Sequence, residues 1–415
     1  METYKISDRD IAIKTSLRWL QGRVKDDNCE GFWRIHNHLY DLSTFKHPGG
    51  NSWLELTKGT DITEAFETMH VQNISPAVLE KYKVKPAVGP RNYRYTFNED
   101  GFYKSLKRKV QPILKKSGTG PSLRSKIIQD MLALCFILFF LTLCRYPSTS
   151  LALVTGLALG MCSSCAHNFF HQADKVAWRR YYFDMSLLSH RDWRISHAIS
   201  HHLYTNSFSD IEVSALEPII NFLPDKKNIV QRFFSHFYIY LAMFVSFPIE
   251  FMKRVFLVVS GQQDLLLENL LPVLQLIILL LYNDLATSVS LWLLFHCTSG
   301  FWLIVTSVTT THHHPELYHA GDVPREDTDW GLHQVDTVRD VEKRSLAVVL
   351  TTFGDHLLHH LFPSVDHSKL AQLYPALYET CKEFEEDYSF KFVPEMILGM
   401  HERMASTQPI IFLKN

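Results

Sequence analysis

Three clusters of histidines after residue 166 have spacings that suit metal binding. The clusters read HNFFH, HAISHH and HLLHH, and they supply eight imidazoles: His167 and His171; His197, His201 and His202; His356, His359 and His360. On a helix, residues three or four positions apart share one face, so each cluster can turn its rings toward a common point. Imidazole suits iron, zinc and copper, so the ligand type alone does not choose the metal. Eight ligands exceed what one ion uses while keeping a position open, which favours two ions.

A single histidine beside an apolar segment is usually an interfacial polar residue without chemistry. Burying eight such rings together is costly unless a metal organises them. The clustering therefore favours a metal centre over eight independent polar side chains.

A second chemical signature lies near the N-terminus, where HPGG at 47–50 is followed by DITEAFETMH at 61–70. An iron with imidazoles on both haem faces cannot bind oxygen and can only pass single electrons. His47 and His70 are the candidate pair, and Pro48 and the glycines after it let the backbone turn tightly beside a porphyrin. Together with FWRIHNHLYDLSTF upstream, the segment resembles the cytochrome b5 haem-binding domain. The resemblance implies a b-type haem (heme b) held by these two histidines.

Apolar segments long enough to cross a membrane begin only after residue 126. A hydrocarbon core of ~30 Å needs about 20 apolar residues, and segments 127–146 and 149–166 form one predicted hairpin. Segments 265–282 and 286–306 form a second. The histidine clusters on either side of 230–258 must lie on one side of the membrane to share a site. We therefore expect 230–258 to be an interfacial amphipathic helix and not a fifth span.

These segments give a fold class and a domain organisation. Residues 12–90 contain short alternating pieces typical of strands and form the haem-binding domain, 91–126 are a Lys- and Arg-rich linker, and 127–415 are the membrane domain. The predicted fold is a small α+β domain followed by an all-α membrane domain of four transmembrane helices plus interfacial helices. The first 25 residues hold no long apolar h-region, so we expect no cleaved signal peptide and both termini in the cytosol.

Composition excludes some partners and redox roles. The formal net charge is −1, which gives no overall attraction to nucleic acid. The basic linker directly precedes a span, so a cytosolic flank is the better interpretation of its charge than a nucleic-acid patch. Seven scattered cysteines make no disulfide framework, and the Cys162–Cys165 pair is more typical of helix packing than of redox or zinc chemistry.

The three histidine clusters resemble the histidine boxes of the membrane fatty-acid desaturase and hydroxylase superfamily. The resemblance covers residues 127–385 and extends to RDWRISHAISHHLYTN, THHHP, DTDWG and HHLFP. It implies two non-haem iron ions on the cytosolic side, held by the eight clustered histidines and a further one after the last span. His314 matches that ninth position best, and His312 is the alternative.

Two positions depart from the family pattern. Members usually have Asp after the first histidine of the first box, where this chain has Asn168, and members with a fused haem domain often begin the third box with Gln, where His356 stands. Asp355 is equally consistent with an acceptor that orients a ligand ring and with a solvated charge. His296 lies mid-span, where a packed polar residue is favoured over a lining of an acyl tunnel. His367 and five other histidines receive no role.

The resemblance implies an O2-dependent desaturase that puts a double bond into a fatty-acyl chain. Electrons would come from NADH-cytochrome b5 reductase through the chain's own haem, and the endoplasmic reticulum membrane is the expected location. The substrate class is a fatty-acyl lipid or acyl-CoA. Two alternatives stay open: a lipid hydroxylase with the same metal centre, and a non-catalytic membrane electron carrier.

Overall fold

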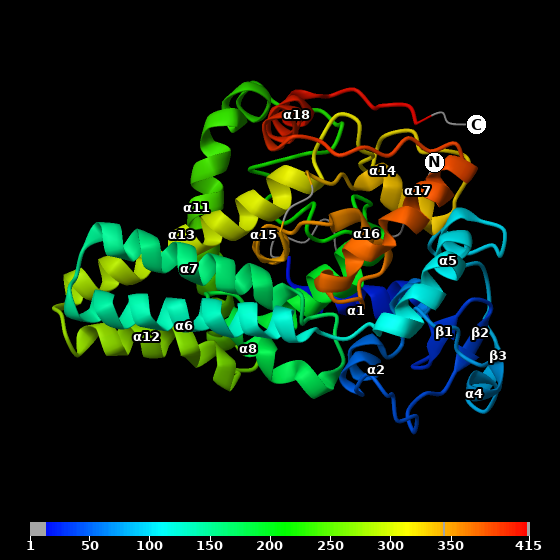
Figure 1. Ribbon diagram of the computed structural model, residues 1–415, viewed down its shortest axis with the longest axis horizontal. Helices are drawn as coiled ribbons and strands as arrows, with labels where there is room; N and C mark the ends of the chain where they lie inside the picture. The colour runs from blue at the N-terminus through cyan, green and yellow to red at the C-terminus, as the bar shows by residue number, and fades with distance from the viewer. Residues whose placement is uncertain (1–13, 343–344, 413–415) are drawn as a thin grey trace.

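The computed structural model describes residues 14–342 and 345–412. Residues 1–13, and with them the start of the predicted haem domain and half of the segment inspected for a signal peptide, lie outside the described residues. A bundle of long helices extends along the long axis from a broader body of short helices (Figure 1). The small N-terminal domain lies at the edge of that body, away from the tip of the bundle.

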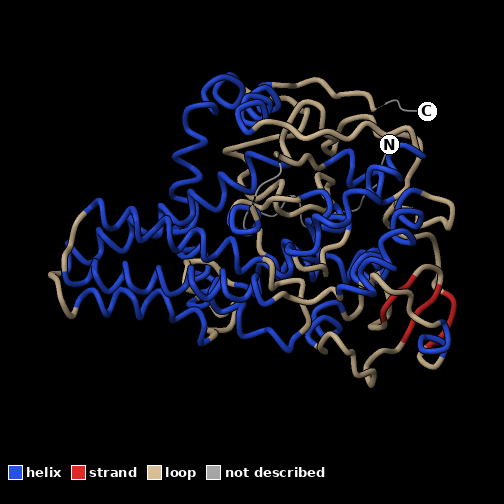
Figure 2. Tube along the Cα trace, in the orientation of Figure 1, coloured by secondary structure: helices blue, strands red, loops and turns tan. Residues whose placement is uncertain are grey.

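The N-terminal domain combines short helices with one small sheet, as predicted. Strands β1 (Trp33–Ile35), β2 (His38–Tyr40) and β3 (Lys83–Pro86) pair antiparallel in the order β1-β2-β3, drawn red in Figure 2. Trp33, Ile35 and Tyr40 are buried in its core. Its helices are α1 (Ser16–Asp27), α2 (Ser52–Thr57), α3 (Thr63–Met69) and α4 (Pro76–Glu80).

The basic linker forms helix α5 (Phe102–Ser117). Phe102, Leu106 and Val110 recur on one face and are fully buried, while Lys115 and Lys116 are exposed. The helix packs against α14 (Trp330–Thr337) and α17 (Tyr374–Glu383) of the body. The linker therefore joins the two parts through an apolar contact as well as through the chain.

Three helices are long and apolar enough to cross a membrane among the described residues. They lie within α6 (Leu123–Arg145), α7 (Thr149–His167) and α13 (Leu285–Thr311). Between the first two, Ser148 accepts a hydrogen bond from the backbone N–H of Leu151, so the new helix begins immediately after the turn.

The predicted span 265–282 is shorter than expected in the structure. Its helical part comprises a 3-10 turn (Leu267–Leu270) and α12 (Leu271–Leu280), and Leu267–Leu280 is classed with the short apolar helices. At 1.5 Å per residue, such a helix covers roughly 21 Å of a ~30 Å core. The described residues therefore contain three full-length candidate spans and one short apolar helix beside them.

Helix α11 (Ser235–Val259), which follows a π-helical turn (Val230–Phe234), corresponds to the predicted interfacial segment. It is not among the candidate spans, and it runs across the direction of α6, α7 and α13 (Figure 1). Phe237, Leu241, Met252 and Phe256 are exposed on it. An exposed apolar face is compatible with a helix at a membrane surface, and the interfacial position of 230–258 stays a prediction.

Small residues allow α7 and α13 to approach closely. A Cβ atom at Gly156 would lie 2.5 Å from the backbone oxygen of Phe295 and 2.6 Å from Thr298 Cβ, so only glycine fits there. Cys162 and Cys165 are free and buried in the same helix, which agrees with their predicted packing role. The two helices therefore pack in close contact along their middle parts.

Short elements form the body at that end of the bundle. They are a 3-10 helix (Asp174–Arg180), α8 (Tyr181–Asp184), α9 (His190–Trp193), a π-helix η2 (Arg194–His201), α10 (His202–Tyr204), α15 (Leu346–Thr351), α16 (His356–Leu361), a 3-10 helix (His367–Leu373) and α18 (Val393–Ala405).

Candidate metal centre and haem pocket

Nine buried imidazoles meet where the bundle joins the body. They come from the end of α7 and the turn after it, from η2 and α10, from the residue after α13, and from α16. Their ligand atoms form two groups, each within 4.8 Å: a five-histidine group of His167, His171, His197, His202 and His359, and a four-histidine group of His201, His312, His356 and His360. All eight clustered histidines predicted as ligands lie in these groups.

In the five-histidine group, ring nitrogens converge on one point. His197 Nε2 lies 2.7 Å from His167 Nε2 and 3.0 Å from His202 Nε2, and His359 Nε2 lies 3.2 Å from His167 Nε2. Neither nitrogen of buried His171 has a hydrogen-bond partner.

The four-histidine group is adjacent and similarly compact. His312 Nε2 lies 2.7 Å from His356 Nε2 and 3.2 Å from His201 Nε2. The rings of His202 and His360, one from each group, stack with centroids 4.2 Å apart. Two ions held by these groups would therefore be neighbours.

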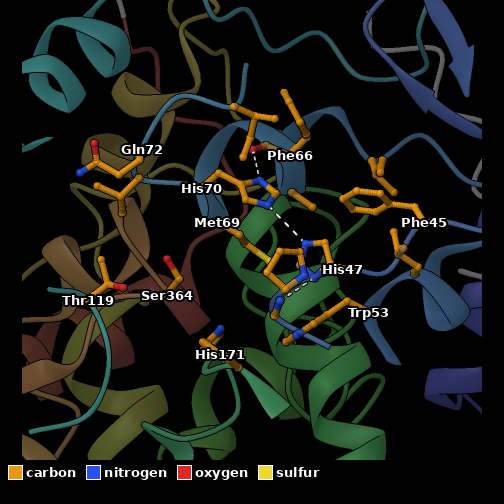
Figure 3. Close-up of a pocket in the computed structure, with 18 of the residues that line it drawn as sticks. Phe45, His47, Trp53, Phe66, Met69, His70, Gln72, Thr119, His171 and Ser364 are labelled. Carbon is orange, nitrogen blue, oxygen red and sulfur yellow. Dashed lines mark hydrogen bonds between the residues drawn. The ribbon is translucent and has the colours of Figure 1, made fainter. Parts of the chain in front are cut away.

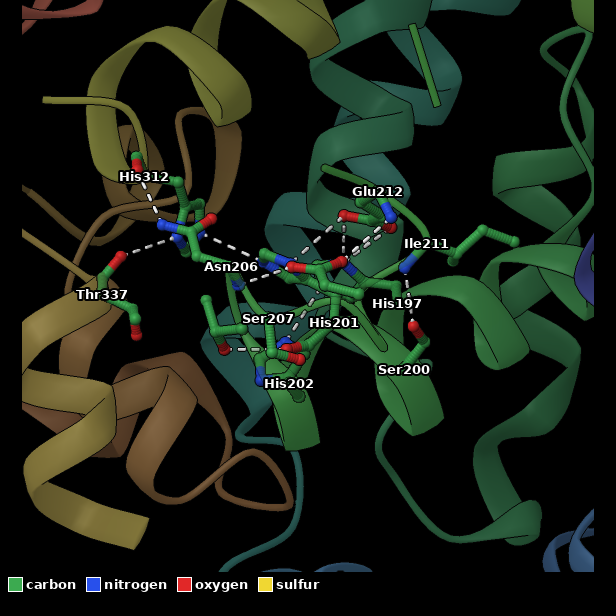
Figure 4. Close-up of polar contacts among 12 residues, drawn as sticks. His197, Ser200, His201, His202, Asn206, Ser207, Ile211, Glu212, His312 and Thr337 are labelled. Atoms are coloured by element: carbon green, nitrogen blue, oxygen red, sulfur yellow. Dashed lines mark hydrogen bonds and ion pairs between the residues drawn. The ribbon is translucent and has the colours of Figure 1, made fainter. Parts of the chain in front are cut away.

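The π-helix η2 explains how one segment serves both groups. The backbone N–H of His202 donates to the oxygen of His197, five residues earlier, which widens the turn. His197 and His202 therefore lie side by side in the five-histidine group, whereas His201 is directed to the other group, as Figure 4 shows. The sequence predicted that the box would ligate, without predicting this division.

Hydrogen-bond acceptors behind two rings of the four-histidine group favour an arrangement that suits a cation. The Thr337 backbone oxygen, which can only accept, lies 3.3 Å from His312 Nδ1, and the Asp210 carboxylate lies 2.8 Å from His201 Nδ1. In a neutral ring with its proton on Nδ1, Nε2 carries a lone pair. When both rings are neutral, their Nε2 lone pairs face each other at 3.2 Å, and a cation between them would accept both.

His360 supports the same conclusion. Its Nδ1 lies 3.0 Å from Gln334 Oε1, while its Nε2 is buried without a partner. Burial lowers the pKa of His202, His356 and His360 well below the usual value, so these rings are neutral, the form that binds metals. The donor set therefore fits metal ions, and imidazole suits iron.

The ninth imidazole is His312, not the preferred candidate His314. His312 directly follows the last residue of α13, so its ring stays in register with the metal centre. Two residues on, the chain has turned: His314 Nδ1 accepts the N–H of Glu316, and its ring lies against Gly399 of α18. The THHHP motif gave both candidates, and only the course of the backbone separates them.

Two carboxylates that sequence reasoning missed lie behind the ligand rings. Asp210 accepts from His201 Nδ1, and Glu212 lies 3.2 Å from His197 Nδ1. A signal was present, since both follow the second box within 15 residues of His197. Asp355, considered for this role, instead accepts the hydroxyl of Tyr374 at 2.9 Å.

Asn168, which departs from the family pattern, is fully engaged. Its Nδ2 donates to Asp366 Oδ2 at 2.7 Å, and its Oδ1 lies 2.7 Å from His367 Nδ1. The ring of His367 lies 4.4 Å from that of His359. His367, to which the sequence assigned no role, therefore contacts Asn168 of the first box and His359 of the third box.

A cavity of about 650 Å³ in the N-terminal domain contains the predicted haem ligands. His47 Nε2 and His70 Nε2 face each other at 3.4 Å across it, and Phe45, Trp53 and Phe66 are among its lining residues (Figure 3). The Nδ1 N–H of His70 donates to the backbone oxygen of Phe66 at 2.9 Å, so its Nε2 lone pair is directed inward. An apolar cavity between two opposed imidazoles fits a haem with both axial positions filled.

The same cavity reaches the metal centre. His171, Gln172 and Ser364 of the membrane domain line its opposite wall, and Figure 3 shows His171 beneath His47. One imidazole of the five-histidine group therefore forms part of the wall of the haem pocket.

Charged and aromatic contacts hold the two parts together. Arg194 of η2 lies over the Trp53 ring, with Cζ 4.0 Å from the centroid, and its guanidinium donates to Ser52 Oγ at 3.2 Å. The hydroxyl of Tyr204, two residues after His202, donates to buried Glu64 at 3.2 Å. Glu64 lies on α3, which ends at Met69, directly before His70. Helices α2 and α3 therefore both contact the segment carrying the second box.

His296, at mid-span in α13, lies apart from both sites. Its ring packs between Trp292 and Phe295, with centroids 4.9 and 4.3 Å away, and it does not line the described cavity.

Two family models match the chain in agreement with these sites. The fatty acid desaturase model matches residues 146–392, and the cytochrome b5-like haem/steroid-binding domain model matches residues 18–91. The first region contains every residue of both histidine groups, and the second contains His47 and His70.

Relatives share both regions. A "cytochrome b5-related protein" of Drosophila melanogaster is 38% identical, covering 97% of this chain and 94% of its own. A "Delta(5) fatty acid desaturase A" of Dictyostelium discoideum is 25% identical, covering 86% of each chain. An "Acyl-lipid (8-3)-desaturase" of Mortierella alpina is 24% identical, covering 91% of this chain and 93% of its own.

Proposed function

The chain belongs to the fatty acid desaturase family, with a cytochrome b5-like domain fused at its N-terminal side; from this premise we propose that it is a membrane di-iron desaturase that introduces a double bond into a fatty-acyl chain. It would use O2 and electrons delivered through its own haem. The family uses two irons and the fused domain binds haem, and the buried histidine groups are compatible with a metal site.

One observation carries the proposal: two adjacent groups of five and four buried imidazoles, drawn from four separate parts of the chain. A non-catalytic carrier has no need for such a set, because burying so many polar rings without ions is costly. We assign His167, His171, His197, His202 and His359 to one iron and His201, His312, His356 and His360 to the other. His47 and His70 are the proposed haem ligands.

Bound iron would supply oxygen activation and hydrogen abstraction, and haem would supply electrons one at a time. The protein's own residues hold the rings neutral, exclude water and orient the ligands. The wall shared by His171 and His47 keeps the transfer distance short, and the contacts of Arg194 with Trp53 and of Tyr204 with Glu64 hold the haem domain in place.

We further propose that α6, α7, α12 and α13 cross the membrane as two hairpins, with α11 lying on its surface. The short α12 is compensated by the apolar residues beside it or by local thinning of the bilayer. Both histidine-bearing ends, of α7 and α13, then face the cytosol, where Lys115, Lys116 and Arg124 are exposed. The endoplasmic reticulum and NADH-cytochrome b5 reductase are the corresponding location and partner.

The substrate class follows from the relatives' names, which specify fatty acids or acyl lipids. The test is expression in a host with a defined lipid composition, followed by fatty-acid profiling. A new double bond that disappears in His312→Ala supports the proposal. A new hydroxyl group would assign the same centre to a lipid hydroxylase. No modified lipid, from a protein carrying haem and two non-haem irons, would contradict the proposal.

A further inference from the structure

The loop after α10 turns back and brings two carboxylates to the rear of the second histidine box. Figure 4 shows Glu212 directed toward His197. Both Glu212 carboxylate oxygens lie 3.2 Å from His197 Nδ1, and Asp210 Oδ2 lies 2.8 Å from His201 Nδ1. The two carboxylates are separated by one residue in sequence, and the rings that they approach most closely belong to different histidine groups. Glu212 Oε2 also lies 4.0 Å from His201 Nδ1, farther away than Asp210.

The loop is built to hold these carboxylates in place. Asp210 Oδ2 accepts the N–H of Asn206 at 2.8 Å, and its Oδ1 accepts the N–H of Glu212 at 2.9 Å. Ser200, on the π-helix between the two ligands, donates to the backbone of Ser209 at 2.7 Å and accepts the N–H of Ile211 at 2.9 Å. The helix that carries the ligands and the loop that carries the carboxylates therefore form one hydrogen-bonded unit.

Each carboxylate fixes which nitrogen of its imidazole is free. A carboxylate can only accept, so it holds the ring proton on Nδ1 and leaves a lone pair on Nε2. His197 Nε2 then points into the five-histidine group and His201 Nε2 into the four-histidine group. Each carboxylate also places negative charge behind one cation position.

We propose that Asp210 and Glu212 are positioning residues. Each of them orients one histidine ring toward one of the two metal ions. Glu212 acts through His197 on the ion of the five-histidine group, and Asp210 acts through His201 on the ion of the four-histidine group. The inference rests on the proposed two-metal function.

The division is asymmetric in one respect. Glu212 is partly exposed, with 27% of its side chain accessible, whereas Asp210 is 1% exposed and also stabilises the loop backbone. We therefore expect Glu212 variants to affect metal binding with little effect on folding, and Asp210 variants to affect both.

The experiment measures Fe(II) binding to the purified full-length protein in detergent, with the haem spectrum of the same chain as an internal reference for folding. Loss of an outer-sphere carboxylate typically weakens metal affinity about 10–100-fold. Glu212→Ala is expected to weaken one of the two ions by this factor and leave the other unchanged. Glu212→Gln, which keeps an acceptor oxygen, is expected to recover part of the loss. The control is Glu217→Ala, which removes from the same loop a carboxylate paired with Lys14 at 3.0 Å.

Double variants identify which ion each carboxylate serves. Glu212→Ala and His171→Ala act on the same ion, so their effects should not add, whereas Glu212→Ala and His360→Ala act on different ions and should add. The effect of Asp210→Asn should add with that of His171→Ala and should not add with that of His360→Ala. The inference would be overturned, with the proposed function left intact, if Glu212→Ala bound both ions with unchanged affinity. It would also be overturned if the effect of Glu212→Ala added with that of His171→Ala and not with that of His360→Ala. A wild-type protein that carries haem and binds no Fe(II) would overturn the proposed function as well.

Discussion

The guanidinium of Arg194 lies over the ring of Trp53, with 4.0 Å between Cζ and the ring centroid. Arg194 begins the π-helix that carries His197 and His201 of the two histidine groups, and Trp53 is part of the wall of the haem pocket. This single contact therefore connects the pocket proposed to hold the haem to the residues proposed to hold iron. It also gives the domain junction a testable role in electron transfer.

Replacing Arg194 with Ala should slow electron transfer from the haem without releasing the haem. A partly buried cation–π contact contributes about 1–2 kcal/mol, equivalent to roughly a tenfold change in the population of the docked arrangement. Stopped-flow absorption of the reduced haem after mixing with O2 and acyl substrate measures the rate. Arg191→Ala, which breaks an ion pair with Glu268, is the matched control. An unchanged rate in Arg194→Ala would show that the contact has no part in docking.

Replacing His70 with Ala should remove the haem and leave the metal centre. His70 Nε2 faces His47 across the pocket, so its loss leaves one axial position empty. The ratio of Soret absorbance to protein should fall several-fold, while non-haem iron per chain stays constant. His36→Ala, which removes a surface ring paired with Glu67 at 2.8 Å, should retain haem. Full haem retention in His70→Ala would refute the proposed ligand pair.

His312→Ala and His314→Ala form a matched pair two residues apart. Only His312 lies in a histidine group, so only its removal should cost non-haem iron, by about tenfold or more in affinity from the loss of one ligand of four. Iron per haem, measured by elemental analysis, separates the two. Iron loss in His314→Ala with normal content in His312→Ala would reverse the assignment.

Asn168→Asp should destabilise the junction of the first and third boxes. The new carboxylate would meet Asp366, which now accepts a hydrogen bond from Asn168 at 2.7 Å, and an uncompensated buried charge costs about 3 kcal/mol or more. The melting temperature should fall. The double variant Asn168→Asp with Asp366→Asn restores one carboxylate and one amide, and should regain most of the loss. A single variant as stable as wild type would remove the argument for this pair.

Stability should decline as the pH falls below about 6.5, in part through His333. Burial lowers the pKa of His333 from 6.5 to about 3, while its Nε2 lies 2.8 Å from the Thr205 oxygen. Between these two pKa values, the unfolded chain binds a proton at His333 and the folded chain does not. The free energy of unfolding is therefore unaffected by His333 above pH 6.5 and decreases as the pH falls toward 3. In His333→Gln, the melting temperature should depend less steeply on pH over this window. An identical slope in both proteins would exclude the contribution.

The eight clustered histidines could be predicted as candidate ligands because the members of each cluster are close in sequence, whereas His47 and His70 were identified through the HPGG and DITEAFETMH motifs. Spacings of three to five residues identify one helix face, and a repeated residue type identifies the chemistry. The choice between His312 and His314 could not be made, since it depends on where the chain leaves α13 and turns toward α18. The assignment of His197 and His201 to different groups depends on a π-helix, for which the sequence offers no signal.

The carboxylates that contact the rings of His201 and His197 were not predicted either, because their role also depends on the course of the backbone. Asp210 and Glu212 are ordinary loop carboxylates until the loop folds back onto η2. Three predicted spans coincide with the long apolar helices α6, α7 and α13, whose apolar runs are continuous, whereas the prediction overestimated 265–282, where the helix covers only Leu267–Leu280. The contact between haem pocket and metal centre joins residues more than 100 positions apart, such as His47 and His171, and needed the fold.

The most direct test of the account is the metal content of the purified full-length protein. We expect three irons per chain, one in haem by its absorption spectrum and two released by acid without the porphyrin, with the iron of the four-histidine group weakened by removal of His312. A protein that holds its haem iron alone, under conditions where Fe(II) is supplied and the fold is intact, would contradict it.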